Sequence, residues 1–205
     1  MEIFPLFASN LVSIILKENL SLFSSEIKKT SFYDAKLSGS KKSLASNDLK
    51  ILKKYTDIES IILNNFQYYA KNVLDIDNNF IISTSWITKV DKGSYSQLHS
   101  HKNSFYSGVL YFDEYDVNDT GKLEFYSPVL PHTDFLILPK NYNIFNSSTW
   151  TISPQKNLLI FFPSYLYHQI IEHSSENTRY SLAFNIVPTG EYGTGDSLSN
   201  AVWNY

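Results

Sequence analysis

The chain has no cysteine, and this absence excludes a disulfide scaffold, a thiolate-bound zinc or iron–sulfur site and thiol catalysis. It has no excess of positive charge either. Its 20 acidic residues against 17 Lys plus Arg give a formal net charge of −3, which argues against nucleic acid as a partner. The longest early apolar run, residues 11–16, stops at Lys17, far short of the roughly 20 residues of a membrane-spanning helix. It also lacks a basic leader, so we expect a soluble cytoplasmic protein with no signal peptide and no membrane segment.

What the chain does contain is typical of a folded domain. Of its 205 residues, 43% are hydrophobic and 16% aromatic, enough for a sizeable core without disulfides. This length suits one domain. Changes in hydrophobic periodicity divide residues 1–205 into a mainly helical N-terminal part (1–79), a β-rich core (80–190) and a turn-rich C-terminal tail (191–205).

Two helices are expected in the N-terminal part. Asn10 is placed to cap a short helix that runs to Ser24, with its apolar residues on one face. A polar loop, residues 37–46, follows, and a second helical stretch starts near Asn47. Within this stretch, residues 56–59 (TDIE) match a capping box, and apolar residues at helical spacing continue behind it.

From Phe80 onward the pattern changes to short segments rich in β-branched and aromatic residues, separated by clusters of Gly, Pro, Asn and Asp. Strands do not alternate with helices, so we do not expect a doubly wound parallel sheet. The pattern therefore predicts a mainly β protein with a closed or double-sheet domain. The expected strands are residues 80–90, 105–112, 121–126, 135–139, 148–152, 158–163, 167–173 and 179–187.

The five histidines give the first indication of chemistry. His99 and His101 are two apart, and residues two apart in an extended chain project to the same side. Two such imidazoles can bind one metal ion, and His168, which follows a strongly apolar strand, is the best candidate for a third ligand. The set predicts a site for iron or another first-row divalent ion. His132 and His173 are expected to face solvent.

Arg179 is the only arginine in a chain with 16 lysines. A guanidinium binds a carboxylate through two parallel hydrogen bonds, which an ammonium does not do. Arg179 lies eleven residues after His168 and opens a strand, so two antiparallel strands of a barrel would bring both side chains into one lumen. Ser181, two residues further on, would face the same side.

The spacing His168-x10-Arg179-x-Ser181 resembles that of the iron(II)- and 2-oxoglutarate-dependent oxygenases. More narrowly, the opening residues 3–7 (IFPLF), Trp86 with its strand, and two long stretches resemble a group of such oxygenases from marine phages and bacteria. The two stretches are residues 99–112 (HSHKNSFYSGVLYF) and 161–186 (FFPSYLYHQIIEHSSENTRYSLAFNI). The resemblance implies a double-stranded β-helix, a jelly-roll or cupin-like barrel, with N-terminal α-helices packed on its major sheet. A phage-encoded member would work in the host cytoplasm.

The same resemblance implies the cofactors and roles. Iron(II) and 2-oxoglutarate would react with O2 to hydroxylate a C–H bond of a small molecule or protein side chain, releasing succinate and CO2. His168 would bind iron, and Arg179 with Ser181 would hold the far carboxylate of 2-oxoglutarate. Tyr111 is a secondary candidate for the cosubstrate carboxylate, although an ordinary barrel aromatic fits its position equally well. Trp86 and Asn185 are further candidates to face the pocket.

One departure from the wider superfamily concerns the first ligand pair, which is usually His-x-Asp or His-x-Glu. Here the residue two positions after His99 is His101, and the residue two positions after His101 is Asn103, so neither position supplies a carboxylate. Three ligand sets remain open: His99, His101 and His168; His101 and His168 with Asn103 or water; or His99 and His168 with His101 supporting them. We favour the first on geometry.

Two other functions are compatible with parts of the pattern. Gly93, five residues and then His99-Ser100-His101 is cupin spacing, although the usual cupin glutamate is missing, so an isomerase or another dioxygenase without 2-oxoglutarate is one alternative. A non-enzymatic jelly roll of a virion is the other, but it would need no converging histidines and arginine. Substrate choice is expected to depend on the loops 113–121 and 139–148, and edge strands with exposed aromatics would allow a homodimer.

Overall fold

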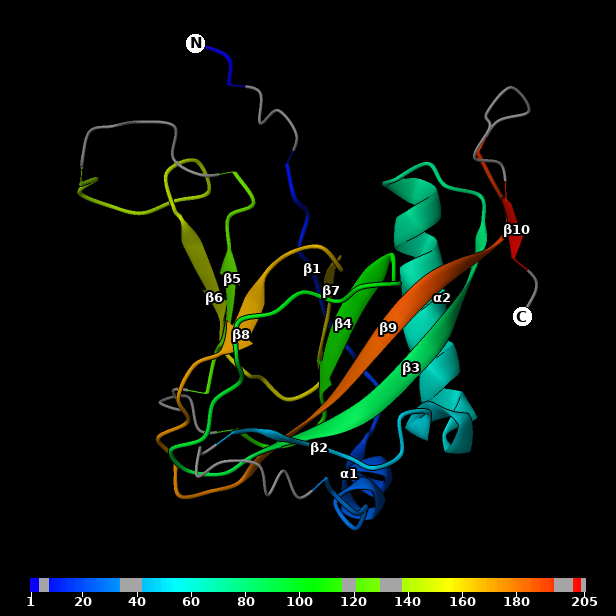
Figure 1. Ribbon diagram of the computed structural model, residues 1–205, viewed down its shortest axis with the longest axis vertical. Helices are drawn as coiled ribbons and strands as arrows, with labels where there is room; N and C mark the ends of the chain where they lie inside the picture. The colour runs from blue at the N-terminus through cyan, green and yellow to red at the C-terminus, as the bar shows by residue number, and fades with distance from the viewer. Residues whose placement is uncertain (4–7, 34–41, 116–120, 130–137, 194–200, 204–205) are drawn as a thin grey trace.

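The computed structural model describes residues 1–3, 8–33, 42–115, 121–129, 138–193 and 201–203. These residues form two antiparallel sheets that face each other (Figure 1). The large sheet has the strand order β1-β7-β4-β9-β3-β2, with β10 added at the end of β9, and the small sheet has the order β6-β5-β8. The strands are β1 (Val12–Ile15), β2 (Leu44–Ala45), β3 (Asn79–Val90), β4 (Tyr106–Tyr111), β5 (Leu123–Tyr126), β6 (Thr149–Ile152), β7 (Leu158–Pro163), β8 (His168–Ile170), β9 (Arg179–Tyr192) and β10 (Ala201–Trp203).

The large sheet is buried on both faces, which explains its nearly continuous apolar strands. All six residues of β7 are buried. One apolar cluster lies between this sheet and the helices, and a second lies between the two sheets. Side chains of β4 alternate between the clusters, so that Leu110 packs toward the helices and Tyr111 toward the small sheet. The side chains of the large sheet that point away from the helices, toward the small sheet, are therefore the ones that can build a site between the sheets.

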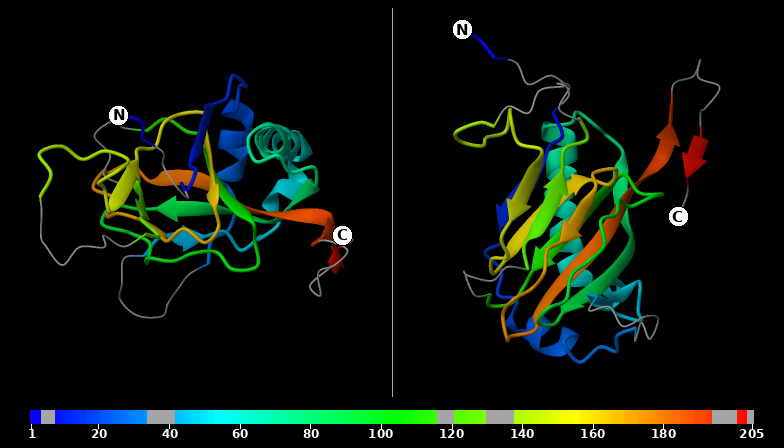
Figure 2. Two further views of the ribbon diagram at one scale, coloured as in Figure 1. Left: turned by 90° about the horizontal axis from the view of Figure 1, so that it is seen from above. Right: turned by 60° about the vertical axis from the view of Figure 1, so that its left-hand side comes forward.

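The helices are α1 (Ser21–Ile27), the 3₁₀ turn η1 (Ile51–Lys54) and α2 (Thr56–Asn72). The buried face of α2 lies against the large sheet, as Figure 2 also shows. Its Phe66 ring contacts the rings of Phe80, Tyr106 and Phe161 at centroid distances of 4.9, 5.2 and 5.3 Å. None of the described helices is long and apolar enough to cross a membrane.

The first expected helix, from Asn10 to Ser24, was wrong. Residues Val12–Ile15 form β1, which pairs with the edge of β7, and the helix begins only at Ser21. The apolar spacing of this segment fits either structure, and the free hydrogen-bonding edge of β7 decides for the strand. Its β-branched residues suit that outcome.

The capping box was also wrong. Tyr55 occupies the N-cap of α2 and makes no capping hydrogen bond with its side chain. The Glu59 carboxylate instead accepts a hydrogen bond from Lys53 Nζ at 2.6 Å. Thr56 lies inside the first turn, where its hydroxyl cannot act as a cap.

Seven of the expected strands are present, as β3 to β9. Of the expected strand at 135–139, residues 135–137 lie outside the described residues, and residues 138–139 are not in a strand. The first part of the predicted loop 37–46 is likewise not described, whereas Leu44 and Ala45 form β2. In the tail, β9 extends to Tyr192 and pairs with β10.

Gly108 in β4 marks the closest packing within the large sheet. A Cβ atom on this residue would clash with Cζ of Phe184 and would lie 2.6 Å from the backbone oxygen of Ile160. The Phe184 ring on β9 thus covers the space where a side chain would stand, and only glycine fits between the neighbouring strands.

We expect Gly108→Ala to lower the free energy of unfolding by about 1–3 kcal/mol, because overpacking would force two neighbouring strands apart. Chemical denaturation followed by tryptophan fluorescence measures this change. Thr151→Ala, at an exposed position of β6, is the control and should change stability by no more than about 0.5 kcal/mol. Equal stability of the two variants would contradict the close packing.

Candidate functional site

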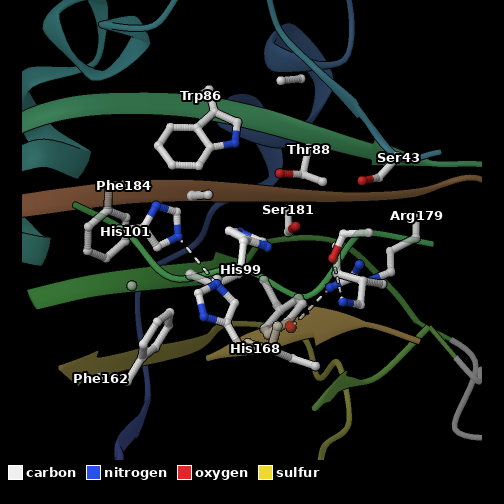
Figure 3. A pocket seen from close by; sticks show the side chains of 18 of the residues that line it. Ser43, Trp86, Thr88, His99, His101, Phe162, His168, Arg179, Ser181 and Phe184 are labelled. Atoms are coloured by element: carbon white, nitrogen blue, oxygen red, sulfur yellow. Dashed lines mark hydrogen bonds between the residues drawn. The ribbon is translucent and has the colours of Figure 1, made fainter. Parts of the chain in front are cut away.

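A cavity of about 140 Å3 lies between the two sheets and is lined by residues of both (Figure 3). His99, His101 and His168 line it together with Arg179 and Ser181, so the structure brings the five principal candidates into one space. Tyr111 and Trp86 line the same cavity.

The backbone places two of the histidines opposite each other. His99 and His168 form an antiparallel bridge, with hydrogen bonds of 3.0 Å from His99 N to His168 O and 2.9 Å from His168 N to His99 O. Residues opposite each other in such a pair project to the same face. His168 is also opposite Phe125 of β5, and the rings of Phe125 and Phe162 pack against its imidazole.

The three imidazoles are close enough to share one ion. Their ligand nitrogens all lie within 4.8 Å of one another, and Nε2 of His101 is 3.3 Å from Nε2 of His168. Two nitrogens that bind one ion at about 2.1 Å are about 3.0–3.4 Å apart. The pair His101–His168 already has this separation, and a small movement of His99 would complete a three-nitrogen face.

Two of the rings are oriented by backbone carbonyls. Nδ1 of His99 lies 2.7 Å from the oxygen of Gln97, and Nδ1 of His168 lies 2.9 Å from the oxygen of Leu166. A carbonyl only accepts, so each Nδ1 carries a proton, and in the neutral ring Nε2 then presents a lone pair. This is the tautomer that binds a metal ion through Nε2.

The electrostatic surroundings keep two of the imidazoles neutral. Burial, helped by nearby His99, lowers the pKa of His101 to about 4. Burial lowers the pKa of His168 to about 3, with the hydrogen bond to Leu166 opposing and the two other histidines adding to the shift. Both rings are therefore unprotonated at neutral pH, and metal binding requires that form.

Asn103 does not share this arrangement. It is exposed, is not among the residues that line the cavity, and adopts a left-handed backbone conformation with φ of 57°. Asn tolerates that conformation better than most residues, so its place in the turn has a backbone explanation. The ligand set that includes Asn103 loses support.

Ser164, 1% exposed, holds the turn that follows the histidine pair. Its backbone oxygen accepts from His101 N at 2.9 Å, and its backbone nitrogen donates to Phe105 O at 3.1 Å. Its hydroxyl is 2.7 Å from the hydroxyl of Ser104 and 2.8 Å from that of Ser107. The segment between β3 and β4 is thus fastened to the turn between β7 and β8, directly beside the histidines.

Arg179 is buried, with 3% of its surface exposed, and lies at the other side of the cavity. Its Nη2 donates to the hydroxyl of Tyr111 at 3.0 Å, and its guanidinium carbon lies 5.1 Å from the Tyr111 ring centroid. Its Nε and Nη1 are buried without a hydrogen-bond partner among the described residues, and no ion pair of those residues includes it. A buried guanidinium with open donors is the kind of group that binds a carboxylate.

Ser181 and Tyr111 occupy the positions that alternation predicts. Ser181 is 2% exposed and stands opposite Thr88 in the β3–β9 pair. Tyr111 is fully buried and faces the cavity from β4. Both line the same cavity as Arg179, and the binding of a carboxylate by this group stays a prediction.

The remaining candidates divide. Trp86 lines the cavity, with its ring 5.8 Å from that of His101. Asn185 is not among the lining residues; its Oδ1 accepts a hydrogen bond from Ser107 Oγ at 2.8 Å, and its Nδ2 donates to Thr84 Oγ1 at 2.9 Å.

The expectation for His173 was wrong, and His132 lies outside the described residues. His173 has no exposed surface, because its backbone pairs with Gly93 and Ser94 and its Nε2 lies 2.7 Å from Asn177 O. It lies after the end of β8, where the chain is still hydrogen-bonded to the segment that follows β3.

Sequence reasoning missed three hydroxyl groups of the cavity wall. Thr88 could have been found, because it lies two residues after Trp86 on the same strand face. Ser43 and Ser96 also line the cavity, but each lies next to or within a loop, where no periodicity predicts a direction.

Comparison with known families shows to which family the chain belongs. A family model described as "Putative 2OG-Fe(II) oxygenase" matches residues 84–185, about half of the chain and all of its histidine and arginine cluster. The chain belongs to the 2OG-Fe(II) oxygenases. The cofactors named by this family are iron(II) and 2-oxoglutarate, and the histidine cluster fits the metal, so this part of the prediction is confirmed. The narrower likeness to marine phage proteins stays a prediction.

Solved structures of other 2OG-Fe(II) oxygenases have the same fold. HygX from Streptomyces hygroscopicus, with nickel, 2-oxoglutarate and hygromycin B bound, has a TM-score of 0.63 at 11% identity, covering 88% of this chain and 84% of that one. A Pseudomonas putida prolyl-4-hydroxylase has a TM-score of 0.56 at 12% identity, covering 86% and 91%. A family member from Burkholderia pseudomallei has a TM-score of 0.57 at 10% identity, covering 82% and 77%. The predicted double-stranded β-helix is confirmed. No curated protein matches the chain.

We expect Ser164→Ala to weaken binding of a divalent metal ion by about 10-fold to 100-fold. The variant keeps the two backbone hydrogen bonds of this turn, but the hydroxyls of Ser104 and of the buried Ser107 lose their partner beside the histidines. Titration with Co²⁺ in a calorimeter measures the affinity. Ser60→Ala, at an exposed position of α2, is the control and should bind as the unaltered chain does. An unchanged affinity in Ser164→Ala would remove this serine from the support of the metal site.

Proposed function

We propose that the chain is a dioxygenase that hydroxylates a C–H bond of a small molecule or protein side chain. In such a reaction one oxygen atom of O2 enters the substrate as a hydroxyl group and the other enters succinate, while 2-oxoglutarate loses CO2. The observation that carries the proposal is the buried Arg179, whose Nε and Nη1 have no partner among the described residues, in the same cavity as three converging imidazoles.

The cavity fits the two cofactors for different reasons. A buried charge is costly unless a ligand pairs with it, so the open donors of Arg179 favour an anion. The neutral imidazoles favour a first-row divalent ion. 2-Oxoglutarate carries a keto acid at one end, which chelates a metal, and a second carboxylate at the other end. Arg179 lines the same cavity as the histidines, so one molecule can meet both groups.

Each residue then has a distinct task. His99, His101 and His168 would hold the metal ion from one face and leave its other positions open. Arg179 would bind the far carboxylate, with Ser181 and Tyr111 beside it as hydroxyl partners. The bound iron and cosubstrate supply the oxidising chemistry. The apolar walls of the barrel, including Phe162 and Phe125, exclude water around the reacting groups.

The three-histidine set is the ligand arrangement that we propose. It is supported by the close approach of all three rings and by the exposed position of Asn103. Two observations weigh against the cupin alternative: the family match, and the Nε and Nη1 donors of Arg179, which have no partner among the described residues. A metal site without 2-oxoglutarate does not need such open donors. The same two observations weigh against a non-enzymatic virion protein.

His168→Ala should abolish metal retention while the barrel stays folded, because the backbone pairing of β8 with β5 and with His99 does not depend on this side chain. The metal content after anaerobic loading with Fe(II), and the weak visible absorption band that forms when 2-oxoglutarate joins the metal, measure the effect. The thermal unfolding temperature is the control for folding. Retention of stoichiometric iron by this variant would argue against His168 as a ligand.

Arg179→Lys should lose most activity although it keeps the positive charge, because an ammonium cannot make the two parallel hydrogen bonds of a guanidinium. We expect the apparent affinity for 2-oxoglutarate to fall by about 10-fold to 100-fold, measured by titrating the visible band and by succinate formation. Unaltered turnover by the Lys variant at low 2-oxoglutarate would contradict the proposed role of Arg179.

A further inference from the structure

The described residues that line the cavity include no carboxylate and no lysine. Arg179 is the one fixed charge among them, because arginine keeps its proton in proteins. The three histidines bind a metal ion in their neutral form and so bring no negative charge. A divalent ion that enters this cavity therefore meets a wall that is already positive.

That repulsion is not relieved by the groups around the guanidinium. The contact of Arg179 with Tyr111 is a hydrogen bond to a neutral hydroxyl and a contact with the ring. No ion pair of the described residues neutralises it. Because the side chain is 3% exposed, screening by water and salt is weaker than at the surface.

A dianion that reaches both the metal and Arg179 would supply the missing negative charge. Resting on the proposed function, we propose that the metal ion and 2-oxoglutarate bind as one unit, so that this cavity retains the metal tightly only while the cosubstrate is present. The cosubstrate takes over the charge-balancing role that a protein carboxylate would otherwise have. By thermodynamic reciprocity, the metal tightens 2-oxoglutarate by the same factor.

The test measures metal affinity directly, without turnover. The full chain, freed of metal, is titrated with Mn²⁺ in a calorimeter, alone and with saturating 2-oxoglutarate, and each titration is corrected for binding of Mn²⁺ to 2-oxoglutarate in buffer. We expect the cosubstrate to tighten Mn²⁺ binding by about 100-fold. Glutarate, which has the same charge but no keto group to chelate the metal, should tighten it by much less than 2-oxoglutarate does.

A matched pair of variants separates charge from chelation. His101→Asp places a carboxylate beside the metal, and His101→Asn places a neutral group of the same size there. We expect the Asp variant to bind Mn²⁺ alone at least about 10-fold more tightly than the Asn variant, and its tightening by 2-oxoglutarate to fall to about 10-fold or less. Unfolding temperatures of both variants show whether the fold is kept. The titrations of the unaltered chain test the proposal without either variant.

The outcomes are distinguishable. Mn²⁺ that binds equally tightly with and without 2-oxoglutarate overturns this inference and leaves the proposed function standing. Tightening that is the same in the folded Asp variant as in the unaltered chain assigns the coupling to chelation alone and overturns the charge explanation. Absence of Mn²⁺ binding under both conditions, in the folded chain, overturns the proposed function together with the inference.

Discussion

The site depends on one short pairing, the antiparallel bridge between His99 and His168. Two backbone hydrogen bonds join segments that are far apart in the sequence. The geometry of the pair turns both imidazoles to the inner face of the small sheet. β8, which carries His168, has three residues and is held from its other side by β5. The histidine cluster is therefore anchored to backbone rather than to a flexible side-chain network.

Much of this arrangement follows from local pattern, and the failures have a common cause. The alternation and β-branched content of β3 and β9 predicted both strands, and the lone arginine was found by composition. Val12–Ile15 was misjudged because its spacing fits a helix as well, and only the open edge of β7 decides between them. His173 and Ser164 gave no local signal, since their burial comes from backbone pairing with distant segments. Contacts of long sequence separation are what single-sequence reasoning lacks.

Lysine and arginine differ in this chain in how far they are exposed to solvent. The lysines in the described part of the chain are exposed or partly exposed, and among them Lys54 pairs with Asp48 at 2.7 Å and Lys89 with Asp91 at 3.0 Å. Such exposed pairs add little stability. The single guanidinium is instead enclosed, touching an aromatic ring and a hydroxyl. The fold thus tolerates a costly buried charge at one place, which is reasonable where a ligand is to offset it.

Because the chain has a single arginine, chemical modification of that residue can report whether the cavity is occupied. A reagent that reacts selectively with guanidinium groups has one target in 205 residues, and that target lies in the wall of the cavity. Its rate of modification would register whether the cavity is filled, with no knowledge of the substrate. Compounds that enter would protect the chain, and compounds that attach elsewhere would leave the rate unaltered. A composition bias that carries no catalytic meaning thereby gives a direct means of screening for ligands.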